Sequence, residues 1–154
     1  MIGSITEISA LISTLGVVAS ILYLSIQIRQ NTKAARSAVH QQSANRLQER
    51  LLLVCDNDEL AELISRDWSD AISEPEKIKI AYWVSAVISD LRDIHIQCEL
   101  GVMPYSVLHS RAGVVRKKMF CNELALETWH NLRDASSPDF IQWFEKHVLD
   151  AAYK

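Results

Sequence analysis

Hydrophobic residues are concentrated near the start of the chain. Residues 8–28 form a run of 21 residues without a formal charge, bounded by Glu7 and Arg29 and rich in Ile, Leu and Val. A helix of that length is about 31 Å long at ~1.5 Å per residue, which matches the ~30 Å hydrocarbon core of a bilayer. The pattern therefore predicts a transmembrane helix within residues 1–30.

A cleavable signal peptide is the alternative interpretation of this run. It is disfavoured because Glu7 and no Lys or Arg precede the run, and because the run is too long. The basic residues follow the run instead, namely Arg29, Lys33, Arg36, Arg46 and Arg50. By the positive-inside rule, we expect a single pass with the N-terminus outside and the rest of the chain in the cytoplasm.

Small side chains recur within the predicted span at spacings of four, three and four residues. They are Ser9, Ser13, Gly16 and Ser20. Residues at these spacings share one helical face and permit the close approach of a second helix, which favours self-association. The alternative is that small residues are simply common in membrane helices.

After the span, no Gly or Pro interrupts residues 30–54. We expect the membrane helix to continue as a juxtamembrane stalk over residues 31–55. Residues 56–154 lack a convincing run of alternating apolar and polar positions, which disfavours strands. The expected fold class is all-α, with an N-terminal transmembrane helix that continues into a small cytoplasmic helical bundle.

The clearest helix start in the bundle is Ser73, because Ser caps helices and Glu76 can complete a capping box. This helix is expected to run to Leu100, where Gly101 supplies a left-handed cap. Its apolar positions recur at three- and four-residue spacing and predict a broad core face, formed by Ile80, Val84, Val87, Ile88, Leu91 and Ile94.

Three further helices are predicted from their start signals. One begins at Pro104, soon after Gly101. Asp56 and Glu59 resemble a capping box before a short helix to about Asp70, and Ser137 begins a last helix to about Ala152. The tryptophans are expected on different helices as packing anchors rather than as a platform for bases: Trp68, Trp83, Trp129 and Trp143.

Composition and charge narrow the class of protein. The 154 residues suit one ordinary domain with an accessory segment, and the net charge of −3 excludes a globally basic nucleic-acid binder. The cysteines Cys55, Cys98 and Cys121 are odd in number and widely spaced, so neither a disulfide framework nor a zinc knuckle is indicated. No DNA partner is expected.

Enzyme and metal motifs are not recognisable by spacing. The sequence has no phosphate-binding Gly-rich loop, no metalloprotease motif and no paired-cysteine motif. Glu127 and His130 have the spacing of a di-iron ligand pair, but no second pair accompanies them. His95 and Cys98 share a helical face, for which a core thiol beside a satisfied histidine is the simpler account. We expect neither enzymatic activity nor a cofactor.

One stretch has a marked charge asymmetry. Residues 100–122 contain no Asp or Glu, whereas several cations and one histidine lie there: His109, Arg111, Arg116, Lys117 and Lys118. These cations must face solvent, a carboxylate from another helix such as Asp90 or Glu123, or an anionic ligand. If the span self-associates, copies of the stretch would surround a symmetry axis and favour a phosphate ligand.

The segment Leu24-Ser-Ile-Gln-Ile-Arg-Gln-Asn-Thr-Lys33, directly after the apolar run, resembles a widespread group of small bacterial membrane proteins without assigned activity. The likeness continues in Glu99-Leu-Gly101, around Trp129 and in Ser137-Pro-Asp-Phe140. The architecture is also similar to that of the membrane effectors of type III CRISPR systems, in which a membrane segment carries an oligomeric helical domain that binds cyclic tetra-adenylate.

This second resemblance implies a function in antiviral signalling at the bacterial inner membrane. It implies a homo-oligomer, a tetramer, that binds the cyclic messenger and perturbs the lipid bilayer. The residues expected to contact its phosphates are Arg111, Arg116, Lys117 and Lys118, with His109 as a polar or stacking partner.

The competing hypothesis is a structural or accessory membrane protein whose helical domain docks onto another protein. In that case the cations of residues 109–118 would be paired within the fold. An exposed aromatic stripe on the last helix, formed by Phe140, Trp143 and Phe144, would then be the partner surface.

Overall fold

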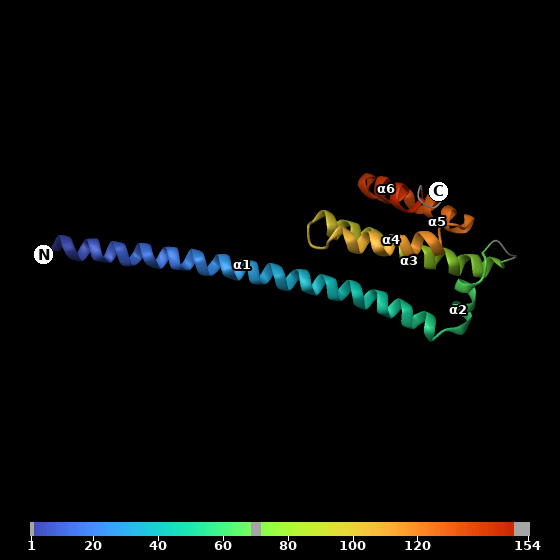
Figure 1. The fold of residues 1–154 in the computed structure, drawn as a ribbon, viewed down its shortest axis with the longest axis horizontal. Helices are drawn as coiled ribbons and strands as arrows, with labels where there is room; N and C mark the ends of the chain where they lie inside the picture. Colours follow the sequence, from blue (N-terminus) through green and yellow to red (C-terminus); the bar gives the residue numbers. More distant parts are fainter. Residues whose placement is uncertain (1, 69–71, 150–154) are drawn as a thin grey trace. The chain divides into compact units, whose positions relative to one another are not determined.

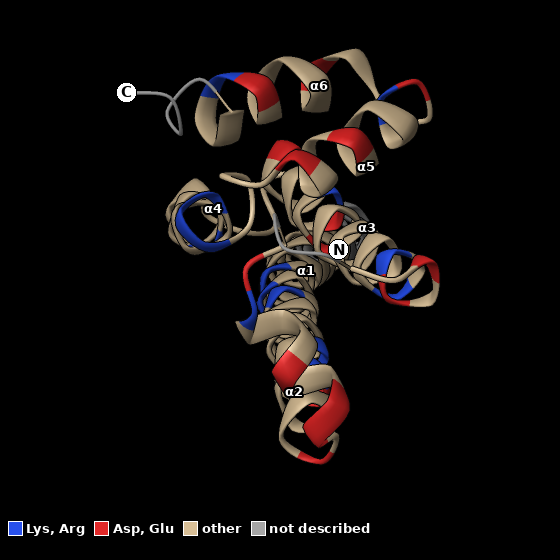
Figure 2. Cartoon of the chain, turned by 90° about the vertical axis from the view of Figure 1, so that its right-hand side faces the viewer, with Lys and Arg blue, Asp and Glu red and all other residues tan. Residues whose placement is uncertain are grey.

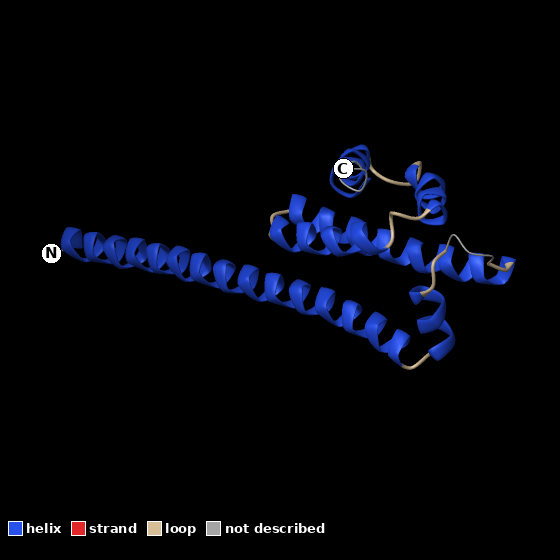
Figure 3. Ribbon diagram, turned by 45° about the vertical axis from the view of Figure 1, so that its right-hand side comes forward, coloured by secondary structure: helices blue, strands red, loops and turns tan. Residues whose placement is uncertain are grey.

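The computed structural model describes residues 2–68 and 72–149, with side chains from residue 13 onward, and these residues fold into helices joined by short loops (Figure 3). The all-α class is confirmed, and no strand occurs in the described ranges. In chain order the elements are α1 (Ile2–Cys55), α2 (Asp58–Ser65), α3 (Glu74–Glu99), α4 (Tyr105–Lys118), α5 (Glu123–Arg133), α6 (Pro138–Phe144) and the π-helical turn η1 (Glu145–Leu149) (Figure 1).

Helix α1 is continuous through residue 55, as the lack of Gly and Pro after residue 30 predicts. The chain divides into two compact units, residues 1–41 and 42–154, so the boundary lies inside this helix. From Leu15 to Ile28 the large apolar side chains are between 48% and 68% exposed.

The predicted membrane span falls only partly on described side chains, because residues 8–12, including Ser9, lie outside them. Within the described residues, no helix has the length and hydropathy that a membrane span requires.

The N-terminus of α3 is fixed by the predicted capping box. The Glu76 carboxylate accepts hydrogen bonds from the backbone N–H of Ser73 at 2.8 Å and from its Oγ at 2.6 Å. These bonds, with a further one from Arg66, lower the pKa of Glu76 to about 2. At the other end Gly101 has φ of 66°, a left-handed conformation that glycine adopts without strain, so both predicted boundaries of this helix are confirmed within a residue.

The start of α2 differs by one residue from its prediction. Asn57, not Asp56, is the N-cap, and its Oδ1 accepts a hydrogen bond from the Leu60 N–H at 2.9 Å. The helix ends at Ser65, and the backbone of the next residue, Arg66, is in an extended conformation. Trp68 therefore lies after α2 and not on a helix, where it is buried and its Nε1 donates to the Leu63 carbonyl.

The last helix begins as predicted, with Ser137 Oγ accepting from the Phe140 N–H. It continues from α6 into η1, whose π-helical hydrogen bonding the sequence did not indicate. The predicted end at Ala152 lies outside the described residues.

The core lies where α3 packs on α4 and α5. The predicted face of α3 is buried at every position, with exposures from 0% to 6%. Opposite it, the largest fully buried side chains are aromatic, and Trp129 stacks on Phe144 at 4.1 Å between ring centroids. Trp129 and Trp143 are buried as expected of packing anchors, whereas Trp83 is only half-buried. Burial of these rings dominates the stability of the domain.

The three cysteines are free, which agrees with the absence of a disulfide pattern. Cys55 and Cys121 are exposed, whereas Cys98 is buried in α3, and this burial raises the pKa of its thiol.

Candidate functional site

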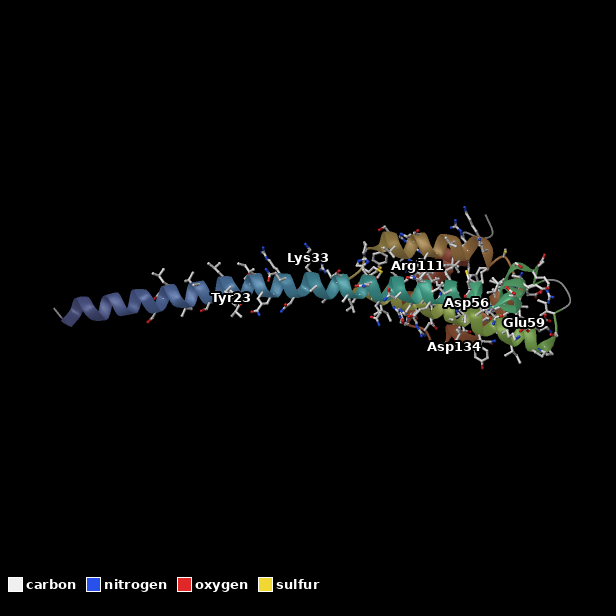
Figure 4. All side chains as sticks on the ribbon, turned by 90° about the horizontal axis from the view of Figure 1, so that it is seen from below. Tyr23, Lys33, Asp56, Glu59, Arg111 and Asp134 are labelled. Atoms are coloured by element: carbon white, nitrogen blue, oxygen red, sulfur yellow. The ribbon has the colours of Figure 1, made fainter. Side chains whose placement is uncertain are left out.

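An ion-pair cluster joins α1, α3 and α4 within the second unit. Arg111 of α4 (labelled in Figure 4) donates from Nη1 to Oδ2 of Asp90 on α3 at 2.8 Å, and from Nη2 to the backbone carbonyl of Ser43 on α1 at 3.3 Å. The Arg111 side chain is 17% exposed and the Asp90 side chain 6% exposed. One guanidinium therefore links three helices from a largely buried position.

Two arginines of α1 complete this cluster. Arg46 donates to Oδ2 of Asp93 at 2.8 Å, and Arg50 lies 3.7 Å from the other carboxylate oxygen of Asp90. We call these five side chains the ion-pair cluster: Arg46, Arg50, Asp90, Asp93 and Arg111. It holds three cations against two anions, so one positive charge is not neutralised within it.

Among the described residues, buried polar atoms in and beside the cluster have no hydrogen-bond partner. The Ser43 side chain, 1% exposed, lies beside it, and both its Oγ and Oδ1 of Asp90 lack a hydrogen-bond partner. Leu51, Leu52 and Leu53 of α1 are at least half exposed nearby in the sequence. This part of α1 is thus attached through charged groups more than through its leucines, and such contacts respond to salt and to competing ions.

The remaining predicted phosphate contacts lie at the end of α4. Arg116, Lys117 and Lys118 occupy its last turn, where the helix dipole favours cations. Lys117 and Lys118 are exposed and Arg116 is half-buried, and none of them forms an ion pair within the described part of the chain. Figure 2 shows this basic end of α4.

The structure does not gather the five predicted ligand residues into one patch. At about 100° per residue, Arg111 and Lys118 share one face of α4, whereas His109 and Arg116 lie on nearly the opposite face. Contacts agree with this separation, since Arg111 bonds to Asp90 and His109 packs against Trp143. A single copy therefore presents the cations around the helix rather than on one surface.

His109 belongs to a cluster of aromatic and imidazole rings between α3, α4, α6 and η1. Its ring centroid lies 5.2 Å from that of His147 and 6.1 Å from that of Tyr105. Trp143 stacks on His147 at 5.4 Å and lies 5.6 Å from His95. Sequence spacing alone did not indicate this cluster, because its members come from four separate elements.

Burial and hydrogen bonding shift two pKa values in this ring cluster. Burial lowers the pKa of His95, partly offset by the charges of Glu99 and Asp139. A hydrogen bond from the Tyr105 hydroxyl to the Glu99 carboxylate raises the pKa of Tyr105 to about 12. Tyr105 is therefore a hydrogen-bond donor at neutral pH, and neither group is adjusted for proton transfer near pH 7.

The imidazole of His130, considered above as a metal ligand with Glu127, faces a backbone carbonyl of its own helix. His130 Nδ1 lies 2.7 Å from the carbonyl of Leu126, one helical turn earlier. Among the residues that the structure describes, no group of three or more His, Cys, Asp or Glu side chains is arranged to hold a metal ion.

The prediction that the aromatic rings of the last helix form an exposed partner surface is wrong. Phe140 and Phe144 are fully buried and Trp143 is 8% exposed, because the three rings pack against α3 and α5. Exposed apolar side chains instead form part of a groove of about 750 Å³ between the end of α1, α2 and α3, which Arg46, Glu49, Arg50 and Lys79 also line. We call it the α1–α3 groove; its apolar lining is Leu53, Leu60, Tyr82, Trp83 and Ala86.

Of the small residues predicted to share one face of the span, Ser13, Gly16 and Ser20 have described side-chain surroundings, and they lie on an exposed surface of α1. Ser13 is exposed, a side chain at Gly16 would meet nothing within 4 Å, and Ser20 Oγ donates to the Gly16 carbonyl at 2.8 Å. The surface is therefore open to a second helix.

The sequence named Asp90 and Glu123 as partners for the basic stretch. Asp90 pairs with Arg111, whereas Glu123 forms no ion pair among the described residues. Arg46 and Arg50 were not predicted in the cluster, because they were considered only for the orientation of the span. No spacing within one helix indicates these pairs, because Arg46 meets Asp93 and Arg50 meets Asp90 only through the packing of α1 against α3.

No protein-family model matches the sequence, no curated protein is detectably similar to it, and no solved structure matches its fold.

Proposed function

We propose that the protein is a single-pass effector of the bacterial inner membrane whose helical domain binds a cyclic oligoadenylate messenger, cyclic tetra-adenylate, and perturbs the bilayer in response. The observation that carries this proposal is the ion-pair cluster. It attaches the helix that would cross the membrane to α3 and α4 through charged contacts that an anionic ligand can change.

The apolar part of α1 supports the membrane assignment. Its described large side chains are exposed to a degree that is rare for a folded protein in water. The Ser20 hydroxyl is bonded to a backbone carbonyl of the same helix, as a polar side chain in hydrocarbon requires. We place residues 8–28 in the bilayer, with residues 42–154 on the cytoplasmic side.

The end of α4 supports the ligand assignment. Arg116, Lys117 and Lys118 have no carboxylate partner among the described residues, so a phosphate would not have to displace one. In a homo-oligomer, a tetramer in this proposal, these cations repeat around a symmetry axis and suit a ring of phosphates. Arg111 then couples the site to α1 rather than contacting the ligand, because Asp90 already holds its guanidinium.

Transmission to the membrane follows from the continuity of α1. A ligand shifts the domain only by its different affinity for two arrangements. If one arrangement breaks an ion pair to Arg46 or Arg50, the backbone hydrogen bonds of α1 pass the movement along the same helix.

The test is a titration of the full chain in vesicles with cyclic tetra-adenylate, and with linear tetra-adenylate as control, at two salt concentrations. We expect binding of the cyclic form that weakens with salt, and loss of binding in the Arg116→Glu/Lys117→Glu variant. Lys146→Glu, on an exposed lysine of η1, is a control for a charge reversal outside α4 and should bind normally. Equal binding by both variants would place the ligand elsewhere.

A second function, docking of a protein partner, is favoured by the α1–α3 groove. A groove between helices with apolar residues in its lining is a common receptor for the apolar face of a partner helix, and the charged residues of this groove would meet polar groups of the partner. Leu60→Glu would abolish partner capture while leaving messenger binding intact, whereas the Arg116→Glu/Lys117→Glu variant would do the reverse. The two functions are thereby separable.

A further inference from the structure

The cationic residues that follow the apolar run of α1 lie on one face of the helix. Arg29, Lys33 and Arg36 are four and three residues apart, and His40 follows four residues later. At about 100° per residue these four positions fall within roughly 60° of one another. They extend about 16 Å along the helix at ~1.5 Å per residue. We call Arg29, Lys33 and Arg36 the cationic stripe.

The stripe has no partner within the described chain. All three side chains are exposed, and none of them forms an ion pair or a hydrogen bond with another described residue. Figure 4 shows Lys33 standing out from α1. No Asp or Glu occurs between Glu7 and Glu49, so the helix itself supplies no neutralising charge.

The opposite face of the same segment is neutral. Asn31, Ala34 and Ala38 lie about 140° to 200° around the helix from Arg29. A helix that is merely solvated usually carries charges of both signs at i, i+4 spacing, which stabilise it. This segment carries one sign on one side, and that arrangement is typical of a surface that meets an anionic layer.

The position of the cationic stripe along α1 indicates that the anionic layer is the lipid headgroup region. Arg29 is the first charge after the apolar run, and Lys33 follows it by about 6 Å along the helix. The headgroup region extends roughly 5–7 Å beyond the hydrocarbon on each side of a bilayer. Arg36 lies about 10 Å beyond Arg29, still within the ~8–10 Å screening length of the anionic surface when its long side chain reaches back.

We infer that the cationic stripe binds the headgroups of anionic phospholipids, such as phosphatidylglycerol, on one side of α1. This inference rests on the proposed membrane span but not on messenger binding. Because the stripe is one-sided, headgroups are attracted to one side of the helix only, which sets its rotation and its tilt in the bilayer.

The experiment uses the full chain in detergent with equimolar phosphatidylglycerol and phosphatidylcholine, and native mass spectrometry to read the retained lipid. We expect phosphatidylglycerol to be preferred. In Arg29→Gln/Lys33→Gln/Arg36→Gln the preference should fall by about fivefold for each cation removed, since a juxtamembrane cation contributes about that factor. No preference in the native chain would overturn the inference.

A matched variant tests the one-sided arrangement itself. Lys33→Gln/Ala34→Lys/Ala35→Arg/Arg36→Gln keeps three cations at similar depth but spreads them around the helix. We expect an intermediate preference, and a preference equal to that of the native chain would show that only net charge matters. Displacement of the lipid by an equimolar single-stranded oligonucleotide would overturn the lipid assignment in favour of general polyanion binding.

The membrane span is read separately by carbonate extraction of vesicles that contain the full chain. Release of the native chain into the supernatant would overturn the proposed span. If the native chain stays in the membrane fraction but shows no preference for phosphatidylglycerol, the proposed span stands and the lipid binding by the cationic stripe is overturned.

Discussion

The apolar core and the ion-pair cluster are both built on α3, but different forces hold them. In the core, aromatic rings from α5 and α6 cover a face of α3 that excludes water almost completely. In the cluster, Asp90 and Asp93 hold arginines from α1 and α4 that keep between 17% and 34% of their side-chain surface exposed. Apolar burial is insensitive to moderate salt, whereas partly exposed ion pairs are screened by it. We therefore expect salt to leave the apolar core of the bundle intact and to weaken its contacts with α1.

The largest effect is expected from removing a core ring. Phe144→Ala should lower the free energy of unfolding by about 3–5 kcal/mol, because the ring is fully buried against Trp129 and Phe120. Urea unfolding followed by circular dichroism measures it. Tyr82→Ala is the control, since that ring is 75% exposed, and it should stay within about 0.5 kcal/mol. Comparable losses in both variants would contradict the assigned core.

The next effect is expected at the centre of the ion-pair cluster. Asp90→Asn leaves Arg111 and Arg50 facing a neutral side chain in a largely buried site, which should cost about 2–3 kcal/mol of unfolding free energy. Replacing Asp90 and Arg111 together by Leu should restore part of the loss, because both charges of that pair are removed and only Arg50, 19% exposed, is left without its Asp90 partner. A double variant less stable than Asp90→Asn would refute this account.

A smaller effect is expected at the edge of the same cluster. Asp93→Asn removes a pair whose side chains are 34% and 44% exposed, so the loss should be at most about 1 kcal/mol. It should also shrink as salt is raised, because exposed pairs are screened more than buried ones. The same urea titration at low and high salt checks this. A loss of unfolding free energy equal to that of Asp90→Asn would contradict the difference between the buried centre and the exposed edge of the cluster.

The smallest effect is expected from the pH dependence of the core. Because the pKa of His95 is lowered on folding from its ordinary 6.5, the unfolded chain binds a proton at a pH where the folded chain does not. Stability from this residue is present above pH 6.5 and declines as the pH falls below it. The charges of Glu99 and Asp139 oppose the shift and keep the effect small.

Urea midpoints between pH 5 and pH 7.5 measure that slope. His95→Gln should flatten it, and the same change at the exposed His40 is the matched control. An equal flattening in both variants would mean that His95 is not its source.

Local signals made the helix boundaries predictable. The capping box of Ser73 and Glu76 and the left-handed Gly101 act within a few residues, so the sequence contains all that determines them. The N-cap role of Asn57 was not predictable, because Asp and Asn cap helices equally well and only the backbone conformation distinguishes Asp56 from Asn57.

The partners of the basic stretch were less predictable, because a cation on a helix is compatible with solvent, ligand or ion pair until the facing helix is known. Arg111 pairs with Asp90 only through the packing of α4 on α3. By contrast, the burial of Phe140, Trp143 and Phe144 could have been foreseen, since residues at i, i+3 and i+4 form one helical face.

The unequal accessibility of the thiols gives the protein its own reporter sites. Cys55 ends α1 and Cys121 precedes α5, both exposed, while the buried Cys98, with its raised pKa, offers little thiolate to a labelling reagent at neutral pH. A pair of fluorophores can therefore be attached at the two exposed positions of the native sequence. Energy transfer between them would follow the end of α1 relative to the bundle as salt or a ligand is added, without a single substitution.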